Sequence, residues 1–232
     1  MFYTNTCSPV KRGTCTEVRR VRDVIERVLR HGIVARTDGS LHLVSPVAVP
    51  AAEGEALRDW IVRERAVRTI EIGLGYGISA LYACEGLIAN GGGTHLVVDP
   101  HQATRFANCG LQVLEEAGLD DLVEHHAEES QTALPRFLSE GRAFDLAFVD
   151  GNHRFDGVFL DLVHLGRLVR AGGIVMLDDH QLPAVAKAAS FCITNLGWTL
   201  EHVSPPDDTH QWAVLRTARS ADERPFDHYV EF

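Results

Sequence analysis

The sequence predicts an α/β fold in which helices cover both faces of a mostly parallel, seven-stranded sheet. From residue 67 to residue 196, short apolar strands alternate with helical patterns, which is typical of a doubly wound sheet. Residues 144–149 form a near-continuous apolar run, as expected for a parallel strand that is buried on both faces. Near the C-terminus, two strand patterns flank a turn-rich loop, which predicts an antiparallel hairpin closing the sheet.

A helical extension precedes this alternating region. Apolar residues recur at helical spacing over residues 16–32, which begin with a capping threonine and end with a glycine. Residues 36–51 are predicted to form an extended linker punctuated by prolines, and residues 53–64 a second helix. Residues 1–15 are polar and unpatterned, and we expect them to be loose. We therefore divide the chain into an N-terminal extension with its linker, residues 1–50, and one domain, residues 51–232.

Each element of the alternating region is bounded by a change of hydrophobic period or by a glycine or proline turn. The predicted strands are residues 67–72, 95–98, 122–126, 144–149 and 174–177. The predicted helices are residues 79–89, 106–117, 130–138, 155–169 and 184–196, and Ala171-Gly172-Gly173 is predicted to end the fourth of them. The strands of the terminal hairpin are residues 198–203 and 211–215, joined by a loop at residues 204–208.

Composition and charge limit the classes of function. The chain has 232 residues, of which 45% are hydrophobic and 23% charged, the balance of a globular protein with a sizeable core. The formal net charge of −10 makes nucleic acid an unfavourable partner, because an acidic surface repels phosphate backbones. No segment approaches the roughly 20 apolar residues that span a bilayer, and the cysteines form no C-x-x-C pair. We expect a cytoplasmic protein without membrane or nucleic-acid partners.

A glycine-rich turn follows the first strand of the predicted sheet. Gly73, Gly75 and Gly77 occupy alternate positions, which lets the backbone turn tightly and approach a ligand closely. The following helix points its N-terminus at the same place, and the next strand ends in Asp99, whose carboxylate is placed to hold two ribose hydroxyls. The spacing differs from the G-x-G-x-x-G of a dinucleotide site. Taken alone, the turn is compatible with any nucleotide-binding fold.

The pattern E-x-G-x-G-x-G, with an acid ending the next strand, resembles the first motif of class I S-adenosylmethionine-dependent methyltransferases, which have a Rossmann-like fold. The resemblance implies that the turn lies against the methionine part of S-adenosylmethionine and that Asp99 binds the ribose. It also implies that Ala127 and Glu128 contact the adenine ring, although a helix N-cap charge is an alternative role for Glu128. The implied cofactor residues are Glu71, Gly73, Gly75, Tyr76, Gly77, Asp99, Ala127, Glu128 and Asp150.

Acidic residues end two neighbouring strands of the predicted sheet. Asp150 follows the strand at residues 144–149, and Asp178 with Asp179 follows the strand at residues 174–177. Because the carboxyl ends of parallel strands meet at one edge, we expect the three carboxylates to converge and to repel each other. A divalent ion would offset them, and oxygen ligands favour Mg²⁺ or Mn²⁺. Helix capping by Asp150 and turn formation by the pair are the structural alternatives.

The stretch from Phe144 to His180 resembles metal-dependent O-methyltransferases of the catechol type and their bacterial relatives. The resemblance implies that Asp150, Asp178 and Asp179 hold the ion. Asp179 departs from the catechol enzymes, which have Asn at that position, and agrees with relatives that methylate sugars and other microbial metabolites. His153 stands three residues after Asp150, where the catechol type has its general-base lysine.

These motifs predict metal-dependent O-methylation of a hydroxylated small molecule, either a secondary metabolite or a sugar-like compound. His153 is the predicted general base beside Asp150, because an imidazole titrates near neutral pH, and His180 is a second candidate for base or ligand. Two alternatives stay open: a metal-independent O- or N-methyltransferase that uses a histidine base, and a catalytically silent module that binds the cofactor. The acceptor and the oligomeric state, a homo-oligomer included, are left open.

Overall fold

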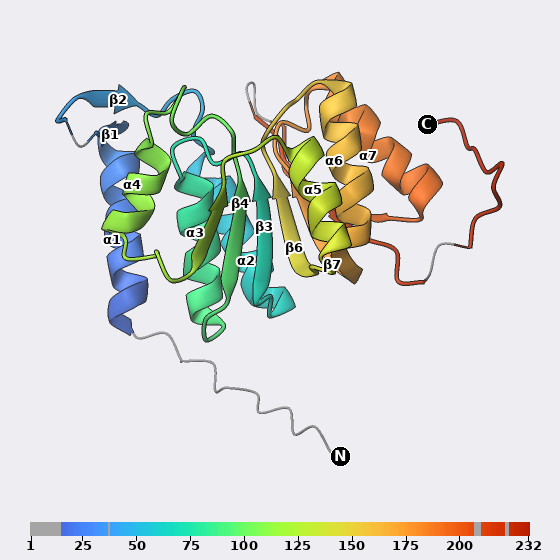
Figure 1. Ribbon diagram of the computed structural model, residues 1–232, viewed down its shortest axis with the longest axis horizontal. Helices are drawn as coiled ribbons and strands as arrows, with labels where there is room; N and C mark the ends of the chain where they lie inside the picture. The colour runs from blue at the N-terminus through green and yellow to red at the C-terminus, as the bar shows by residue number, and fades with distance from the viewer. Residues whose placement is uncertain (1–14, 37, 207–209, 221–222) are drawn as a thin grey trace, which may run out of the picture.

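The computed structural model describes residues 15–36, 38–206, 210–220 and 223–232. Within them, seven strands form one sheet in the order β5-β4-β3-β6-β7-β9-β8 (Figure 1). The first five strands of this order are parallel, whereas β9 runs antiparallel to both of its neighbours. The predicted doubly wound sheet with a C-terminal hairpin is confirmed. The strands are β3 Arg68–Ile72, β4 Thr94–Val98, β5 Val123–His126, β6 Phe144–Val149, β7 Val169–Leu177, β8 Thr199–Val203 and β9 Ala213–Arg216.

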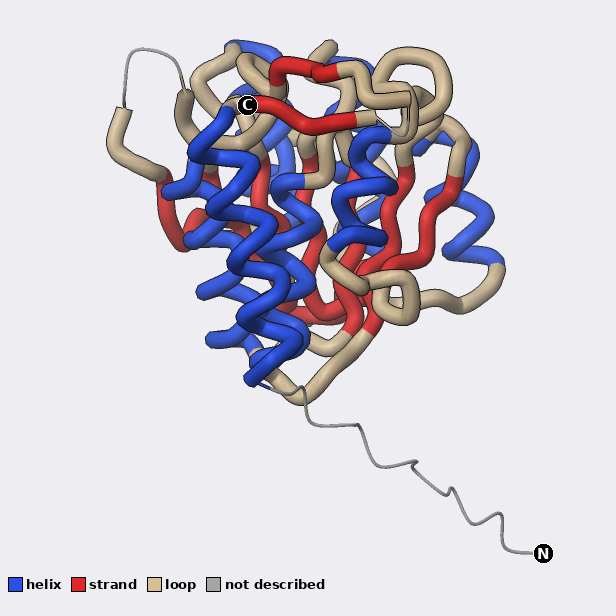
Figure 2. Tube along the Cα trace, turned by 90° about the vertical axis from the view of Figure 1, so that its left-hand side faces the viewer, coloured by secondary structure: helices blue, strands red, loops and turns tan. Residues whose placement is uncertain are grey.

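Helices cover both faces of this sheet, and the side chains of each central strand alternate between the two. On β6, Leu146 and Phe148 pack into the core under α1 to α4, whereas Ala147 and Val149 pack under α5 to α7. Burial on both faces explains why this strand is apolar at nearly every position. Figure 2 shows the strands enclosed between helices. The helices are α1 Cys15–His31, α2 Ala51–Glu64, α3 Ile78–Ala89, α4 Cys109–Glu116, α5 Ser130–Ser139, α6 Phe155–Leu168 and α7 Pro183–Leu196.

The N-terminal extension contains a small hairpin where the sequence analysis predicted an extended linker at residues 36–51. β1 Ile33–Ala35 pairs antiparallel with β2 Leu41–Leu43. Strands of three residues are too short to show the alternation by which a strand is recognised in sequence. The helix before the hairpin, α1, packs against α3 in the same core as the sheet. After the hairpin, residues 46–49 run along the wall of the main cavity.

β7 begins directly after α6, earlier in the chain than predicted. Ala171-Gly172-Gly173, which was expected to end the helix, lies inside the strand. A Cβ on Gly173 would lie only 2.8 Å from the carbonyl oxygen of Asp145 on β6, so glycine permits the close approach of the two strands. Their pairing is irregular at this place, with a register shift between Phe144 and Leu146. A helix stop and a bulged strand both favour glycine, and the sequence pattern does not separate them.

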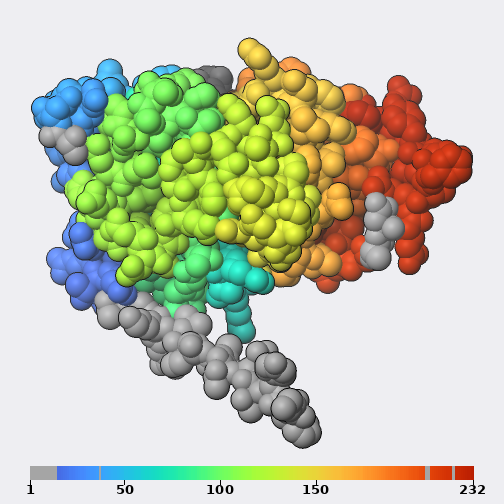
Figure 3. All heavy atoms as spheres, in the orientation of Figure 1, coloured from blue at the N-terminus to red at the C-terminus, as the bar shows by residue number. Residues whose placement is uncertain are grey.

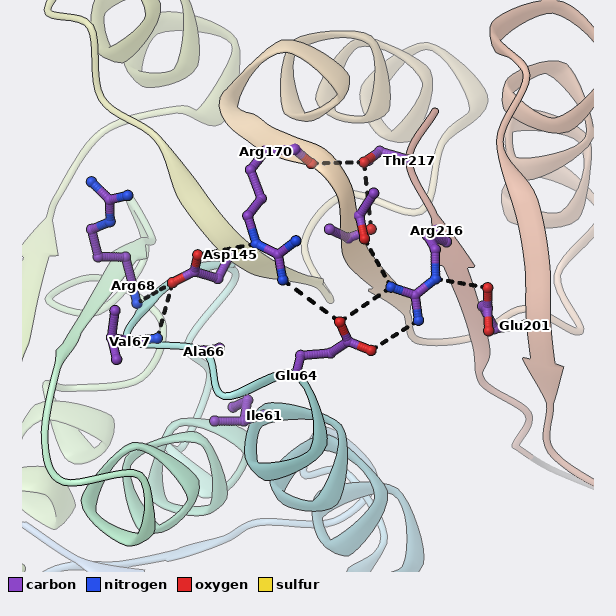
Figure 4. Close-up of polar contacts among 12 residues, drawn as sticks. Ile61, Glu64, Ala66, Val67, Arg68, Asp145, Arg170, Glu201, Arg216 and Thr217 are labelled. Carbon is purple, nitrogen blue, oxygen red and sulfur yellow. Dashed lines mark hydrogen bonds and ion pairs between the residues drawn. The ribbon is translucent and has the colours of Figure 1, made fainter. Parts of the chain in front are cut away.

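Charged side chains at the amino ends of the central strands form a paired group, which we call the amino-end cluster (Figure 4). Glu64, at the end of α2, lies 2.8 Å from the guanidinium of Arg216 on β9 and 3.6 Å from that of Arg170 on β7. Arg216 also contacts Glu201 on β8 at 2.8 Å, and Arg170 contacts Asp145 on β6 at 3.2 Å. The cluster thus fastens α2 to four strands of the sheet.

The two ends of the described chain lie at opposite edges of the molecule. Residues 223–232 lie beside α7, far from α1 (Figure 3), and Asn195 on α7 forms two hydrogen bonds with the backbone of Val230. None of the helices in the described ranges is both long and apolar enough to cross a membrane. The expectation for residues 1–15 lies outside the described residues except at Cys15, and the last two residues of the predicted terminal loop, 207 and 208, lie outside them as well.

Candidate active site

A cavity of about 660 Å³ opens at the carboxyl ends of β3, β4, β6 and β7. Ligands of doubly wound sheets bind at this edge. The sequence-predicted residues in its wall are Gly73, Gly75, Asp99, Asp150, His153, Asp178 and Asp179. The sequence-predicted residues outside its wall are Glu71, Tyr76, Gly77, Ala127, Glu128 and His180. The structure therefore brings together the glycine-rich turn, Asp99 and the acidic ends of β6 and β7.

The glycine-rich turn is shaped by close contacts between strand ends. Gly73 has a φ of +91°, and a Cβ at this position would collide with the carbonyl oxygen of Asp150. Asp99 accepts hydrogen bonds through Oδ2 from the backbone N–H groups of Leu74 at 3.1 Å and Gly75 at 3.2 Å. Its Oδ1 accepts one from the backbone N–H of His101 at 2.7 Å. Asp99 thus fixes the turn from the cavity wall, and its contact with a ribose stays a prediction.

Glu71 lies beneath the turn rather than in the cavity. Its side chain is fully buried, where it accepts a hydrogen bond from Ser79 Oγ and lies 2.7 Å from His95 Nε2. The other ring nitrogen of His95 lies 2.8 Å from Thr69 Oγ1. This buried network joins β3, β4 and the first turn of α3. The network therefore connects the elements on both sides of the glycine-rich turn. A direct contact of Glu71 with the cofactor stays a prediction.

Tyr76 and Gly77 form the last part of the glycine-rich turn, outside the cavity wall. Tyr76 packs edge-on against Phe106, with 5.3 Å between the ring centroids, and Phe106 in turn belongs to the cavity wall. Gly77 is the N-cap of α3 with a φ of +82°. The N-terminus of α3 therefore starts beside the cavity, as expected for a helix that follows a ligand-binding turn.

The loop after β5 reaches the cavity slightly later in the sequence than predicted. Glu128 forms an ion pair with Arg136 on α5, outside the wall. Glu129 and Ser130, which follow it, line the cavity instead. The adenine contacts proposed for Ala127 and Glu128 stay predictions, and Ser130, at the start of α5, is a neighbouring alternative.

Asp150, Asp178 and Asp179 converge at the ends of β6 and β7 as predicted, but they are held differently. Burial and then the neighbouring Asp178 carboxylate raise the pKa of Asp150 well above its ordinary value. Asp178 is only 5% exposed, and its Oδ1 accepts a hydrogen bond from the backbone N–H of Asp179 at 2.6 Å. Asp179 adopts a φ of +51°, and its side chain contacts His153 and Gln181. Two carboxylates therefore face each other, while the third is occupied by neighbours.

His153 connects the ends of the two strands. Its Nδ1 lies 3.1 Å from Asp179 Oδ2, and its Nε2 lies 3.6 Å from Asp150 Oδ1. The hydrogen bond with His153 lowers the pKa of Asp179. When Nδ1 carries the proton and donates it to Asp179, Nε2 keeps its lone pair, and no group in the described ranges hydrogen-bonds to this nitrogen. The ring is therefore oriented either as a base or as a metal ligand, the two roles left open by the sequence.

His180 lies outside this group, although it directly follows Asp179. Its backbone N–H donates a hydrogen bond to the carbonyl oxygen of Gln211 at 2.7 Å, which ties it to the segment before β9. Its side chain is not part of the cavity wall. The structure thus separates the two predicted histidines and brings only His153 to the acidic residues.

Two residues missed by the sequence analysis complete the site: Glu53 on α2 and His210, which precedes β9. His210 Nε2 forms a hydrogen bond with Glu53 and lies 3.0 Å from Asp178 Oδ1. Its Nδ1 lies 3.7 Å from Asp179 Oδ1. Burial raises the pKa of Glu53, and the contacts with Asp178 and Glu53 raise that of His210. One signal was available, because Glu53 stands four residues before the buried Leu57 and so lies on the apolar face of its helix.

The group suits a divalent ion, and we call its six members the carboxyl-end cluster: Glu53, Asp150, His153, Asp178, Asp179 and His210. Ligand atoms lie within 4.8 Å of one another in two sets of three, Asp150 with His153 and Asp178, and Glu53 with Asp178 and His210. A cation would relieve the repulsion between Asp150 and Asp178. Carboxylate oxygens suit Mg²⁺ and Mn²⁺, and an imidazole shifts the preference towards transition metals. Asp179, a predicted ligand, belongs to neither set.

Comparison with known proteins shows which class of enzyme this chain resembles. A family model described as a methyltransferase domain matches residues 70–180, which contain the glycine-rich turn and both acidic strand ends. Over 136 residues, the chain is 29% identical to a candidate caffeoyl-CoA O-methyltransferase of Arabidopsis thaliana. That match covers 59% of this chain and 56% of the relative, so the chain spans little more than half the length of this curated relative.

Solved structures share the fold. TomG of Streptomyces achromogenes, an O-methyltransferase involved in tomaymycin synthesis and solved with S-adenosylmethionine, superposes with a TM-score of 0.64 at 19% identity, over 91% of this chain and 99% of that one. An O-methyltransferase of Bacillus cereus gives a TM-score of 0.64 at 15% identity, over 88% and 91% of the two chains. The chain thus has the Rossmann-like fold of these methyltransferases, and its residues 70–180 match a methyltransferase domain. Both findings agree with the resemblance to class I S-adenosylmethionine-dependent methyltransferases that its motifs indicate.

Proposed function

We propose that this chain transfers a methyl group from S-adenosylmethionine to a hydroxyl oxygen of a small molecule, with the help of a divalent ion. The observation that carries the proposal is that His153 lies beside Asp150 and Asp178 on one cavity wall, where the two carboxylates repel each other. In the described ranges, Nε2 of His153 has no hydrogen-bond partner. The similar proteins named above are O-methyltransferases, which supports oxygen as the acceptor atom.

The two halves of the cavity wall would have different tasks. S-adenosylmethionine would lie along the glycine-rich turn with its ribose at Asp99, and it supplies a methyl group on a sulfonium that an oxygen can attack. Asp150 and Asp178 would hold Mg²⁺ or Mn²⁺, which lowers the pKa of a bound hydroxyl group and fixes its direction. A cavity of about 660 Å³ is in the usual range for small-molecule sites.

His153 takes the proton of the acceptor hydroxyl at Nε2. Asp179 accepts a hydrogen bond from Nδ1, so it fixes the orientation of the ring and stabilises the imidazolium that forms. General-base assistance of this kind contributes about 10²–10⁴-fold to a rate. The acceptor class that fits is a hydroxylated metabolite or sugar-like compound. A cytoplasmic location, a homo-oligomeric state and the division of the chain at residue 50 stay predictions.

A metal-independent reaction is the second candidate. It is favoured by one observation, namely that the His210 imidazole already lies between Asp178 and Glu53 and offsets part of their charge. In this case His153 would act as base without an ion, on an oxygen or a nitrogen acceptor.

The experiment incubates the purified chain with S-adenosylmethionine, Mn²⁺ and a panel of catechols, other phenols and sugars, and detects methylated products by mass spectrometry. We expect O-methylated product that disappears with EDTA and returns with Mn²⁺ or Mg²⁺. Full turnover after exhaustive chelation, with no metal found by elemental analysis, would select the metal-independent reaction. Absence of S-adenosylmethionine binding in isothermal titration would contradict both, and binding without turnover would favour a silent cofactor-binding module.

A further inference from the structure

Glu53 and His210 form a contact that the proposed methyl transfer does not use. The two residues are 157 positions apart in the sequence, and both lie outside residues 70–180, the part that matches the methyltransferase domain. His210 lines the cavity, whereas Glu53 is completely buried behind it. Burying a carboxylate is costly unless a partner offsets its charge. Glu53 lies beside both His210 and Asp178, since ligand atoms of the three residues lie within 4.8 Å of one another. A costly group in this position points to a role in the site.

The nitrogen of His210 that contacts Glu53 also contacts one oxygen of Asp178, so the two carboxylates share one N–H group. His210 Nε2 lies 3.0 Å from Asp178 Oδ1, and the same oxygen accepts the backbone N–H of Asp179 at 2.6 Å. Both contacts engage Oδ1, and neither engages Oδ2. Rotation of the Asp178 carboxylate would break both at once. A carboxylate held through one oxygen presents its other oxygen in a fixed direction, which is what a metal ligand requires.

We propose that Glu53 and His210 are positioning residues of the ion site, in which Glu53 holds the imidazole of His210 and His210 holds the carboxylate of Asp178. The inference rests on the proposed function, because it assumes an ion between Asp150 and Asp178. His210 shares a set of close ligand atoms with Glu53 and Asp178, but not with Asp150 and His153. We therefore assign His210 to the support of Asp178 and not to the ion that lies between Asp150 and Asp178.

The test measures Mn²⁺ affinity by electron paramagnetic resonance, which detects the free ion during a titration of the purified chain. His210→Ala removes the donor to Asp178, and we expect the Kd for Mn²⁺ to rise about 10–100-fold, the usual effect of losing a partner that orients a ligand. Glu53→Leu replaces the carboxylate with an apolar side chain on α2 and should also raise the Kd for Mn²⁺. His210→Gln keeps an N–H donor and should restore part of the affinity.

Two variants serve as matched controls. His202→Ala removes an exposed histidine on β8, and Glu55→Ala removes an exposed acid on α2; both should bind Mn²⁺ like the unaltered chain. The double variant Glu53→Leu with His210→Ala should bind Mn²⁺ no more weakly than His210→Ala alone, because Glu53 acts through His210. The affinity for S-adenosylmethionine, measured by isothermal titration, should stay within about twofold in every variant, since the altered groups lie away from the glycine-rich turn.

Three outcomes would overturn the inference. If His210→Ala binds Mn²⁺ normally while Asp150→Asn does not bind it, the ion site stands and the positioning role is wrong. If His210→Ala loses Mn²⁺ as completely as Asp178→Ala, with no recovery in His210→Gln, then His210 is itself a ligand. If the unaltered chain binds no Mn²⁺ at all, the metal-dependent function fails together with the inference. Circular dichroism of each variant separates these results from a loss of fold.

Discussion

The two clusters of charged side chains lie at opposite ends of one sheet and are balanced in opposite ways. In the amino-end cluster every carboxylate contacts a guanidinium, and the hydrogen bond from Arg216 lowers the pKa of Glu64. In the carboxyl-end cluster four carboxylates share two imidazoles, and burial together with Asp178 raises the pKa of Asp150. Carboxylates at the two ends of β6 therefore meet different electrostatic conditions, because guanidinium groups pair with them at one end and imidazoles at the other.

This difference in charge pairing distinguishes a cluster that stabilises the fold from one that is suited to a reaction. Complete pairing stabilises the fold and leaves no carboxylate free to bind a ligand. Incomplete pairing lowers stability, and proteins keep such arrangements mainly where a ligand or a reaction completes them. Charge balance thus indicates which end of the sheet carries the chemistry, independently of the family resemblance.

The largest expected effect follows Asp150→Asn, which removes a carboxylate from the carboxyl-end cluster, where the negative charges are incompletely paired. Methyl transfer should fall by more than about 10³-fold, because a bound ion contributes several kcal/mol of transition-state stabilisation. In metal-free protein the Tm should rise, since repulsion with Asp178 is relieved. Turnover assays and calorimetry on one preparation measure both effects. A lower Tm would mean that Asp150 stabilises the fold as the amino-end carboxylates do, and the contrast would disappear.

His153→Ala tests whether His153, a member of the carboxyl-end cluster, takes the proton of the acceptor hydroxyl. We expect kcat to fall by about 10²–10⁴-fold with the affinity for S-adenosylmethionine nearly unchanged, as is typical when a general base is lost. His164→Ala, on α6 but outside the cavity wall, is the matched control. Loss of bound metal in His153→Ala would make His153 a ligand, and an unchanged kcat across the pH range would show that another group or water takes the proton.

Arg216→Met removes a positive charge from the amino-end cluster, where every carboxylate is paired. The free energy of unfolding should fall by about 2–3 kcal/mol, because hydrogen bonds to charged groups are lost while the side-chain volume is kept. Urea denaturation measures this loss. The kcat/KM should stay within about twofold of the unaltered chain. A tenfold decrease in kcat/KM would show that the two ends of the sheet are coupled.

The smallest expected effect is the pH dependence of the amino-end cluster. Because the pKa of Glu64 is lowered from its ordinary value of 4.5, its pairing contributes stability that is fully present above that value. The contribution is lost as the pH falls through the lowered pKa. The difference in Tm between the unaltered chain and Glu64→Gln should therefore be constant near neutral pH and shrink below about pH 4.5. A difference that grows on acidification would contradict the assigned direction.

The sheet could be predicted because its signals are local. The apolar run at residues 144–149 and the alternation of strands and helices are set by burial of neighbouring residues. The convergence of Asp150 and Asp178 then follows from topology, since the ends of adjacent parallel strands share an edge. Sequence reasoning was weaker where glycine serves two purposes, as at Gly173, where it permits close approach of strands instead of ending a helix.

The remaining parts of the site depend on contacts that have no local pattern. Glu53 and His210 are 157 positions apart in the sequence, so neither position shows a periodic or spacing signal for the other. Asp179 has a positive φ, and its side chain lies beside His153; its predicted role as an ion ligand stays a prediction. Backbone conformation within a turn of this kind is not readable from an Asp-Asp pair.

The position of β9 has a consequence for the synthesis of the chain. Among the described strands β9 is the last to leave the ribosome, yet it lies inside the sheet, between β7 and β8. Until then β7 presents a bare, apolar edge, which is a template for pairing with other chains. His210 emerges just before β9, so the nascent protein has its glycine-rich turn long before its charge cluster is complete. The interval before β9 emerges is therefore the period in which this protein most needs protection from aggregation.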